Sequence, residues 1–466
     1  MAGRLLATLG ACLLVAACQI APPATPSLAE RCNIPKFVLS TEQPENGIAP
    51  LANPLERSLN AVLAGAPAHA AGIVGGRPKE ALLLSGGSER GAYGAGYLRG
   101  WGERRGGLPD FDLVTGVSAG SILSTAAFIG DYEGPAREFS NVTDERQVLD
   151  RYVRLNSEGD PTLSSFIAVA QKGGFASLQP MGQWLKRYLT SNLNGGERPI
   201  DAAAAKARRS SKPSLFVAAT DTDSGKFVVF DLGEYLRRET EDGSPVPDHV
   251  VDCYVKAVIA SSIVPLAAVP EFIDGRLYVD GGARYGVFAL SLIKGLADVA
   301  MQRRPMPASS PPIAPHVYIL VNGSQDVDPD CKSYKKAGLT PTADVLAPQY
   351  KAFCRDSVGN INYAPPQRPK WSLPSVGLRA VDILINQIYR FSTAVVRLEY
   401  LNAYGDTQGL HFTRIKDDLG PHPFGNSTCE QIEQDDFRRY RPLEFYPNFM
   451  RCLVDYGRQK GGQEGW

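Results

Sequence analysis

The sequence has no excess of charge of either sign, because 49 Lys and Arg residues balance 49 Asp and Glu residues. Nucleic-acid-binding proteins usually carry a basic face, so this balance argues against that class. Histidines are few, five in all, and no Cys-x-x-Cys motif occurs, which argues against a zinc site. Beyond the N-terminal region every apolar stretch of spanning length contains charge or proline, which excludes a polytopic membrane protein.

The length and apolar content are those of a large globular protein. The 466 residues suggest two or three units, or one large domain with an appendage. Their 44% hydrophobic fraction excludes wholesale disorder. We predict a signal peptide at 1–17, a Pro- and Ala-rich tether and arm at 18–78, a main domain at 79–325, and a partly helical C-terminal extension at 326–466 that contains disulfides.

From residue 80 onward, short apolar runs alternate with glycine turns and helix-like stretches, which is typical of an α/β fold. The predicted strands are 81–84, 111–115, 214–219, 226–230, 277–279, 317–321 and 410–415. The predicted helices are 94–104, 119–128, 179–193, 253–262 and 376–404. The last helix could cap a site or complete the domain, and its apolar spacing favours the second role.

The N-terminal residues have the pattern of a secretory signal peptide. Arg4 precedes an apolar run at 5–17 that is too short to span a membrane. Val15-Ala16-Ala17-Cys18 resembles the lipobox of bacterial lipoproteins, which implies cleavage before Cys18 and its acylation, palmitate included. Gln19 then favours the outer membrane, with the protein anchored in the cell envelope and facing the periplasm. The alternative is an ordinary signal peptide in which Cys18 is incidental.

Six cysteines remain after the lipidation site, and an even number in an oxidising compartment favours disulfides. Fifteen pairings are possible. We predict the two local pairs and a third that ties the N-terminal tail to the body: Cys331–Cys354, Cys429–Cys452 and Cys32–Cys253.

A Gly-x-Ser-x-Gly pentapeptide, Gly116-Val117-Ser118-Ala119-Gly120, lies between a predicted strand and a predicted helix. A nucleophile at such a turn needs small flanking residues, so that the backbone packs tightly while the hydroxyl stands clear. The following helix start adds partial positive charge. We therefore interpret Ser118 as a nucleophile, and the alternative is a helix N-cap serine.

A glycine-rich turn, which includes Gly86, Gly87, Ser88, Arg90 and Gly91, follows the first strand. Such a turn points backbone N–H groups at an anion. It lacks the middle glycine and the later acid of a dinucleotide-binding fingerprint, so an oxyanion hole fits better than a cofactor site. Arg90 could steady the loop, contact a phosphate head group or form a surface ion pair.

A third short motif, Asp280-Gly281-Gly282, follows a predicted strand. A carboxylate at a strand end before two glycines can lie close to another backbone segment. By itself the tripeptide is equally typical of a turn.

In this order the three segments resemble the patatin-like phospholipase family, over roughly residues 80–322. Residues 218–226 and 260–265 resemble two further stretches of that family. The resemblance implies a three-layer α/β/α fold with a mixed, mostly parallel sheet. It also implies a Ser–Asp dyad of Ser118 and Asp280, no cofactor or metal, and oxyanion donors at Gly86, Gly87 and Ser88. The family usually has glycine where Ser88 stands, which puts that part of the hole in doubt.

The resemblance implies a serine lipid acyl hydrolase of phospholipase A or lysophospholipase type, with membrane phospholipid as substrate. A carboxylesterase for small soluble esters and a non-catalytic envelope lipoprotein are the alternatives. A Ser–acid–His triad would need His411 or His422, the two histidines downstream of the acid. Neither lies in a recognisable motif, so a structural role is expected for both.

Overall fold

The computed structural model describes residues 31–38, 79–153, 172–192, 196–210, 213–265, 267–288, 315–323, 373–416, 418–440, 444–463 and 466. The predicted signal peptide, Cys18, most of the tether, Cys331 and Cys354 lie outside these residues. The chain divides into two compact units, residues 1–323 with 388–466, and residues 324–387. The fold described below is that of the first unit. None of the helices in the described ranges combines the length and hydrophobicity that crossing a membrane requires.

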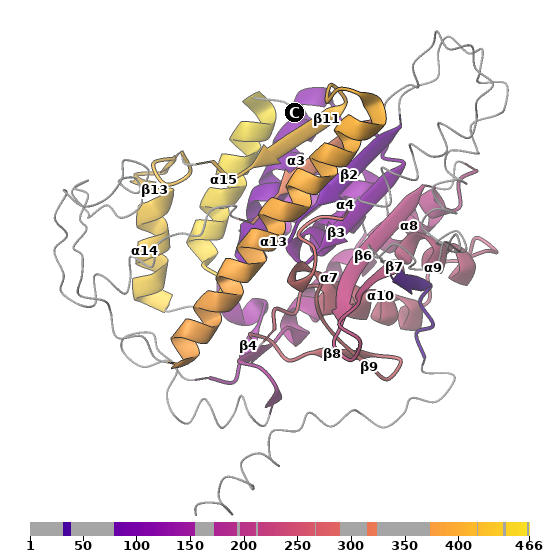
Figure 1. Ribbon diagram of the computed structural model, residues 1–466, viewed down its shortest axis with the longest axis horizontal. Coiled ribbons are helices and arrows are strands. Elements are labelled where there is room, and N and C mark those ends of the chain that lie inside the picture. The colour runs from indigo at the N-terminus through magenta and orange to yellow at the C-terminus, as the bar shows by residue number, and fades with distance from the viewer. Residues whose placement is uncertain are drawn as a thin grey trace, which may run out of the picture. The chain divides into compact units, whose positions relative to one another are not determined.

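A mixed sheet forms the centre of this unit (Figure 1). Five neighbouring strands run parallel, in the order β11-β10-β2-β3-β6, and β7, β1, β9 and β8 continue the sheet with antiparallel pairing. Their bounds are β1 Lys36–Val38, β2 Glu80–Leu84, β3 Leu113–Val117, β6 Ser214–Asp221, β7 Phe227–Asp231, β8 Glu271–Ile273, β9 Arg276–Asp280, β10 His316–Val321 and β11 Leu410–Arg414.

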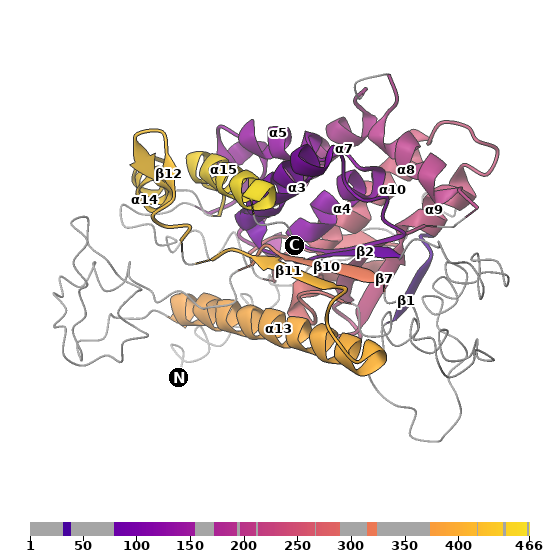
Figure 2. The same ribbon diagram turned by 90° about the horizontal axis from the view of Figure 1, so that it is seen from above.

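Alternate residues of the strands pack into two separate hydrophobic layers. On β2, Leu82 and Leu84 join the larger cluster, whereas Ala81 and Leu83 join the smaller one. The larger cluster contains α3 (Gly91–Arg105), α4 (Ala119–Ile129), α10 (Asp248–Ser261) and α15 (Pro447–Gln463). The smaller cluster contains Val396 and Tyr400 of α13 (Leu373–Tyr404). Figure 2 shows these helices on the two faces of the sheet, which confirms the predicted three-layer fold.

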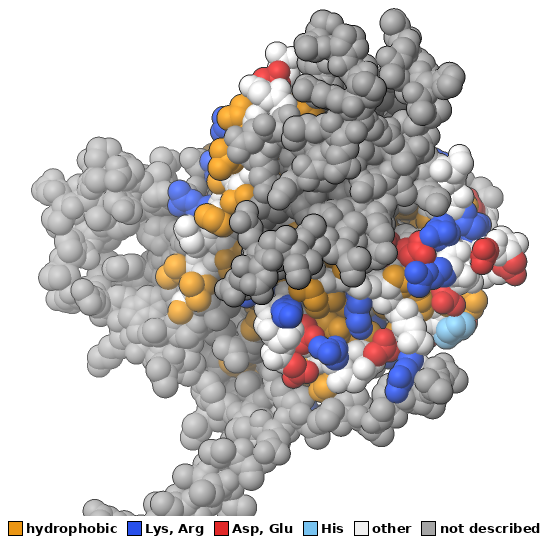
Figure 3. All heavy atoms as spheres, turned by 45° about the vertical axis from the view of Figure 1, so that its right-hand side comes forward, with side chains coloured by type: hydrophobic (Ala, Val, Ile, Leu, Met, Phe, Trp, Pro, Cys, Tyr) orange, Lys and Arg blue, Asp and Glu red, His pale blue; other side chains and the backbone are white. Residues whose placement is uncertain are grey.

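The remaining elements are short and surround these layers. They are η3 Ser88–Arg90, α5 Gly134–Ser140, η4 Glu145–Gln147, β4 Asp150–Arg151, β5 Ala176–Ser177, α7 Gln179–Thr190, α8 Pro199–Ala207, α9 Leu232–Glu239, η5 Gly281–Ala283, β12 Pro423–Phe424, β13 Ser427–Thr428 and α14 Cys429–Tyr440. On the face shown in Figure 3, the described basic and acidic side chains are interspersed, in keeping with the balanced composition.

The C-terminal helical region returns to the sheet and to its main helical layer. β11 pairs in parallel with β10, with Leu410 opposite Val317. α15 packs on α3 through glycines: a Cβ atom on Gly96 would lie 2.1 Å from the carbonyl oxygen of Val454. Residues 388–466 therefore share one compact unit with residues 79–323.

Two of the predicted disulfides are present. Cys32–Cys253 joins the N-terminal arm to α10, and Cys429–Cys452 joins α14 to α15. The arm also contains the short strand β1, which sequence analysis did not predict. β1 pairs with β7, with Phe37 opposite Val229.

Candidate active site

Ser118 occupies a strained turn between β3 and α4. Its φ and ψ of 54° and −126° are unusual for a residue with a side chain. The flanking glycines permit this turn, because a Cβ on Gly116 would lie 2.6 Å from the oxygen of Gly120, and a Cβ on Gly120 would lie 2.3 Å from the oxygen of Leu84. The predicted strand-to-helix elbow is therefore present, with the helix starting directly after Ser118.

The backbone of Ser118 is held by two serines that follow one another in sequence. Its N–H donates to Ser261 Oγ at 2.9 Å, and Ser261 Oγ donates to the carbonyl oxygen of Ala218 at 2.6 Å. Ser262 Oγ donates to the carbonyl oxygen of Ser118 at 3.2 Å. These contacts give the stretch at 260–265 a physical role, which is to fix the elbow.

Asp280 ends β9 beside the elbow. It lies opposite Ala219 of β6, and its Oδ1 accepts a hydrogen bond from Gly282 N–H at 2.6 Å. A Cβ on Gly281 would lie 2.4 Å from the oxygen of Ala218, so glycine lets this loop approach the sheet. The structure thus brings the Asp-Gly-Gly motif against the strand that supports Ser118.

The carboxyl group of Asp280 is buried, and the Ser118 side chain is among the groups that act on its pKa. Burial raises the pKa of Asp280 to about 7, and the hydrogen bonds from Ser118 and from Gly282 N–H oppose that rise. A carboxylate with such a pKa can accept a proton near neutral pH. The arrangement can therefore activate the Ser118 hydroxyl without a third residue.

The glycine-rich loop after β2 faces Ser118. A Cβ on Gly86 would lie 2.8 Å from Ser118 Cβ, and a Cβ on Gly87 would lie 2.6 Å from the backbone of Asn322. Ser88 has a φ of 53°, in the left-handed region that glycine adopts at little cost. The conformation explains why a glycine suits this position, and Ser88 adopts it nevertheless.

Asn322, which follows β10, and Ser85, which follows β2, frame this loop. Asn322 donates from its backbone N–H to Ser85 Oγ at 2.9 Å, and from Nδ2 to the carbonyl oxygen of Ser85 at 2.7 Å. Arg90 N–H donates to the carbonyl oxygen of Gly87 at 3.0 Å and so closes the loop.

The N-termini of α3 and α4 meet beside Ser118, because a Cβ on Gly91 would lie 2.9 Å from Ala119 Cβ. Both helix ends add partial positive charge there.

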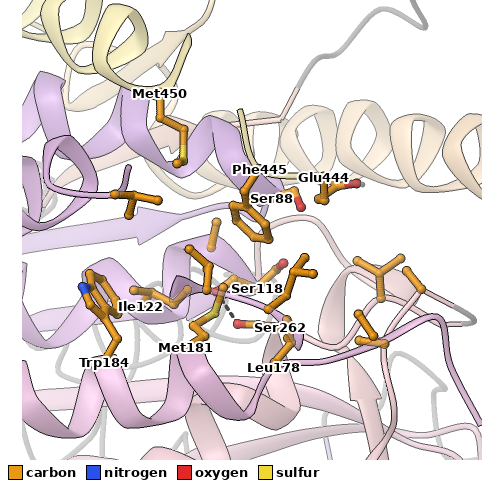
Figure 4. Close-up of a pocket in the computed structure, with 18 of the residues that line it drawn as sticks. Ser88, Ser118, Ile122, Leu178, Met181, Trp184, Ser262, Glu444, Phe445 and Met450 are labelled. Atoms are coloured by element: carbon orange, nitrogen blue, oxygen red, sulfur yellow. Dashed lines mark hydrogen bonds between the residues drawn. The ribbon is translucent and has the colours of Figure 1, made fainter. Parts of the chain in front are cut away.

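An apolar pocket begins at Ser118 (Figure 4). Its walls carry Ile122 of α4, Met181 and Trp184 of α7, and Phe445 from the C-terminal region. Its polar lining residues are Ser88, Ser118, Ser262 and Glu444. A pocket of this composition accommodates a hydrocarbon chain whose polar end lies at Ser118.

The C-terminal wall of this pocket is attached by two buried carboxylates. Glu145 Oε1 accepts hydrogen bonds from the N–H groups of Glu444 at 2.7 Å and Phe445 at 3.0 Å, and Glu89 Oε2 accepts one from Tyr446 N–H at 3.0 Å. Burial, and the nearby charge of Glu444, raise the pKa of Glu89 well above its usual range. Residues far apart in sequence therefore complete one pocket.

Comparison with known proteins agrees with this geometry. Residues 82–293 match the family model described as Patatin-like phospholipase. These residues form a patatin-like phospholipase domain. The match supports lipid hydrolysis as the activity.

Two solved structures resemble the chain at low identity. VipD from Legionella pneumophila is 13% identical, with a TM-score of 0.27, over 72% of this chain and 72% of that one. Human GIVD cytosolic phospholipase A2, in complex with methyl gamma-linolenyl fluorophosphonate and terbium chloride, is 12% identical, with a TM-score of 0.26, over 76% of this chain and 64% of that one. A search of curated proteins finds no significant match.

The histidines considered for a triad lie away from the pocket of the patatin-like domain. His411 Nε2 lies 2.9 Å from His316 Nδ1, and burial lowers the pKa of His411 to about 4. His422 Nε2 lies 3.0 Å from a carboxylate oxygen of Asp455. Neither histidine lines the pocket. Within the described ranges, no three His, Cys, Asp or Glu side chains gather as metal ligands.

Sequence analysis did not identify two residues, Asn322 and Tyr389, that pack around the patatin-like site. Asn322 follows a predicted strand, and polar residues at the ends of parallel strands are candidates for a site, so a signal existed. Tyr389 lies in the middle of a predicted helix, and its spacing gave no signal. Its hydroxyl lies beside Gly86 and Gly282.

Proposed function

We propose that the protein is a serine lipid acyl hydrolase of phospholipase A or lysophospholipase type, with Ser118 as nucleophile and Asp280 as general base. The observation that carries this proposal is the position of Ser118, in a strained strand-to-helix turn at the start of an apolar pocket and beside the buried carboxyl group of Asp280. The pocket favours long acyl chains over the small soluble esters of a carboxylesterase.

The proposed reaction is acyl transfer in two steps. Ser118 Oγ forms a bond to the ester carbonyl carbon while its proton passes to Asp280, and N–H groups of the loop at Gly86, Gly87 and Ser88 stabilise the oxyanion. The carbon–oxygen bond to the alcohol then breaks, and the alcohol takes the proton from Asp280. Water next attacks the acyl-enzyme, gives a proton to Asp280, and releases the fatty acid as that proton returns to Ser118.

The test is covalent labelling of the purified mature protein by a long-chain fluorophosphonate, together with hydrolysis of defined phospholipids, lysophospholipids and short-chain esters. We expect labelling at Ser118 and faster hydrolysis of the long-chain lipids. Ser118→Ala should abolish both. Asp280→Asn should reduce hydrolysis to the level of Ser118→Ala, because no base then accepts the serine proton.

A surface serine provides the matched control. Ser191 lies at the C-terminal end of α7, where its hydroxyl donates to the carbonyl oxygen of Tyr188 at 2.8 Å. Ser191→Ala should label and hydrolyse like the wild type. Absence of labelling in a folded wild-type protein would support the non-catalytic alternative, and a preference for short soluble esters would support the carboxylesterase.

We propose further that Cys18 is lipidated and holds the enzyme at the outer membrane, facing the periplasm, where phospholipid is its substrate. The support is the lipobox-like Val15-Ala16-Ala17-Cys18 after a short apolar run. Each methylene that enters a bilayer contributes about 0.8 kcal/mol, and stable anchoring takes two chains.

Expression in a Gram-negative host with labelled palmitate tests this anchor. The wild type should incorporate the label, partition into the detergent phase and sediment with outer membranes. Cys18→Ser should do none of these. An unlabelled mature protein whose N-terminus differs from Cys18 would instead indicate an ordinary signal peptide.

A further inference from the structure

Four glycines leave the space that one buried tyrosine fills. Tyr389 belongs to α13, outside the residues that match the family. A Cβ on Gly286 would lie 1.7 Å from its Cδ1, and a Cβ on Gly323 would lie 2.7 Å from its Cε2. A Cβ on Gly86 would lie 2.1 Å from its Oη, and one on Gly282 would lie 3.2 Å from the same atom. Three separate segments thus pack around one aromatic ring.

The hydroxyl end of this ring borders both members of the dyad. A Cβ on Gly86 would lie 2.1 Å from Tyr389 Oη and also 2.8 Å from Ser118 Cβ. A Cβ on Gly282, which would lie 3.2 Å from the same Oη, would also lie 2.9 Å from Asp280 Oδ1. Tyr389 is itself buried, at 6% exposure, so it occupies space next to Asp280 that water would otherwise fill.

Hydrogen bonds hold this part of α13 in place. Gly286 N–H donates to Ser392 Oγ at 3.1 Å, and this bond ties the segment after the Asp-Gly-Gly motif to the helix. About two turns after Ser392, Tyr400 Oη donates to the carbonyl oxygen of Pro315, just before β10, at 2.8 Å. These bonds fix α13 relative to the segment after the Asp-Gly-Gly motif and to the start of β10.

We propose that Tyr389 is a positioning residue of the active site, whose ring sets the spacing between the oxyanion loop and the Asp-Gly-Gly loop and keeps water from Asp280. The proposal rests on the hydrolase function proposed above. It assigns the completion of the site to a helix outside the family domain.

The expected consequence concerns the pKa of Asp280. Burial raises the pKa of Asp280, and the hydrogen bonds from Ser118 and Gly282 lower it. Of the groups that face it, Tyr389 is the one from α13, and burial raises the pKa of the Tyr389 hydroxyl well above its usual range, so this group stays neutral. Removing the ring admits water and lowers the pKa of Asp280.

The test compares Tyr389→Ala and Tyr389→Phe on a long-chain ester across pH. Tyr389→Ala should lose about 10²-fold in kcat, as expected for small misplacements, with KM changed less than about threefold. The acid limb of its pH profile should move down by about one unit or more. Tyr389→Phe keeps the ring and should restore both kcat and the acid limb. If Tyr389→Ala does not fold, Tyr389→Leu takes its place.

The matched control is Tyr404→Phe, which removes a tyrosine hydroxyl from the same helix and leaves the two hydrogen bonds described above intact. It should leave the acid limb unchanged. A folded Tyr389→Ala protein with the wild-type acid limb would overturn the proposal. Equal losses in Tyr389→Phe and Tyr389→Ala would also overturn it, because the hydroxyl and not the ring would then be responsible.

A second readout needs no hydrolysis, so it separates this proposal from the hydrolase function. Asp280→Asn is introduced into the wild type, Tyr389→Phe and Tyr389→Ala, and thermal unfolding is measured at pH 5 and pH 8. Asp280→Asn should raise Tm more at pH 8 than at pH 5. This difference between the two pH values should be equal in the wild-type and Tyr389→Phe backgrounds and markedly smaller in the Tyr389→Ala background. Equal gains in all three would overturn the proposal even if no substrate were found.

Discussion

Asp280 combines burial with a charge that its proposed role requires at neutral pH. Its pKa is about 7 in the folded protein against an ordinary value of 3.8. Between these values the folded protein holds a proton that the unfolded chain has released, so stability falls as the pH rises from about 4 to about 7. The carboxylate that we propose as the base for Ser118 therefore lowers the stability of the fold above pH 7.

Asp280→Asn should make this conflict measurable, because the amide does not titrate. At pH 8 the variant should be inactive yet more stable than the wild type, by up to about 4 kcal/mol in free energy of unfolding. Near pH 4 the two proteins should differ little. Urea unfolding at both pH values checks this, and a variant less stable than the wild type at pH 8 would contradict it.

Ser88 stores backbone strain in the glycine-rich loop after β2. Its φ of 53° costs a residue with a side chain about 1–3 kcal/mol. Ser88→Gly should therefore raise the free energy of unfolding by about 1 kcal/mol while changing kcat less than about threefold, since the N–H group keeps its place. Ser88→Ala keeps the Cβ and should bring no such gain. Equal stabilities of the two variants in urea unfolding would refute the strain argument.

At the scale of elements, α3 and α15 approach so closely that glycines are required. A Cβ on Gly457 would lie 2.2 Å from the oxygen of Tyr93, and backbone cannot move aside as a side chain can. Gly457→Ala should lower the free energy of unfolding by about 1–3 kcal/mol. Gly182 of α7 is the control, because a Cβ there would lie 3.5 Å or more from its neighbours. Gly182→Ala should therefore raise the free energy of unfolding by up to about 1 kcal/mol. Equal decreases in the free energy of unfolding of Gly457→Ala and Gly182→Ala would contradict the close-packing argument.

The same scale separates what the sequence could predict from what it could not. Strands such as β2 and β10, and the turn around Ser118, follow from local pattern, so their predicted bounds differ from the observed ones by a few residues. The contact of Tyr389 with Gly86 joins residues about 300 positions apart, and helical spacing identifies a buried face without identifying its partner. β1 was missed because three residues carry too little periodicity, and long-range pairing with β7 stabilises it.

At the scale of the whole molecule, segments outside the family domain complete the site. Phe445 and Met450 line the pocket, and Tyr389 fills the space beside the dyad. The residues proposed to carry the chemistry and those that shape their surroundings therefore lie in different parts of the chain. For this reason the motif residues could be found by resemblance, whereas the pocket wall depended on the tertiary fold.

The two disulfides restrain the unfolded chain over very different lengths. Cys32–Cys253 spans 221 residues and Cys429–Cys452 spans 23, and loop-closure entropy grows with the logarithm of that span. Replacing both cysteines of the first pair by serine should therefore cost about 2 kcal/mol more in free energy of unfolding than the same change in the second. Urea unfolding of the two double variants without reductant measures the difference, and the wild type with reductant is the control. Because none of these four cysteines lines the pocket, the first double variant should keep its rate of fluorophosphonate labelling. Equal losses of stability would show that native contacts, such as the pairing of β1 with β7, outweigh chain entropy in holding the N-terminal arm.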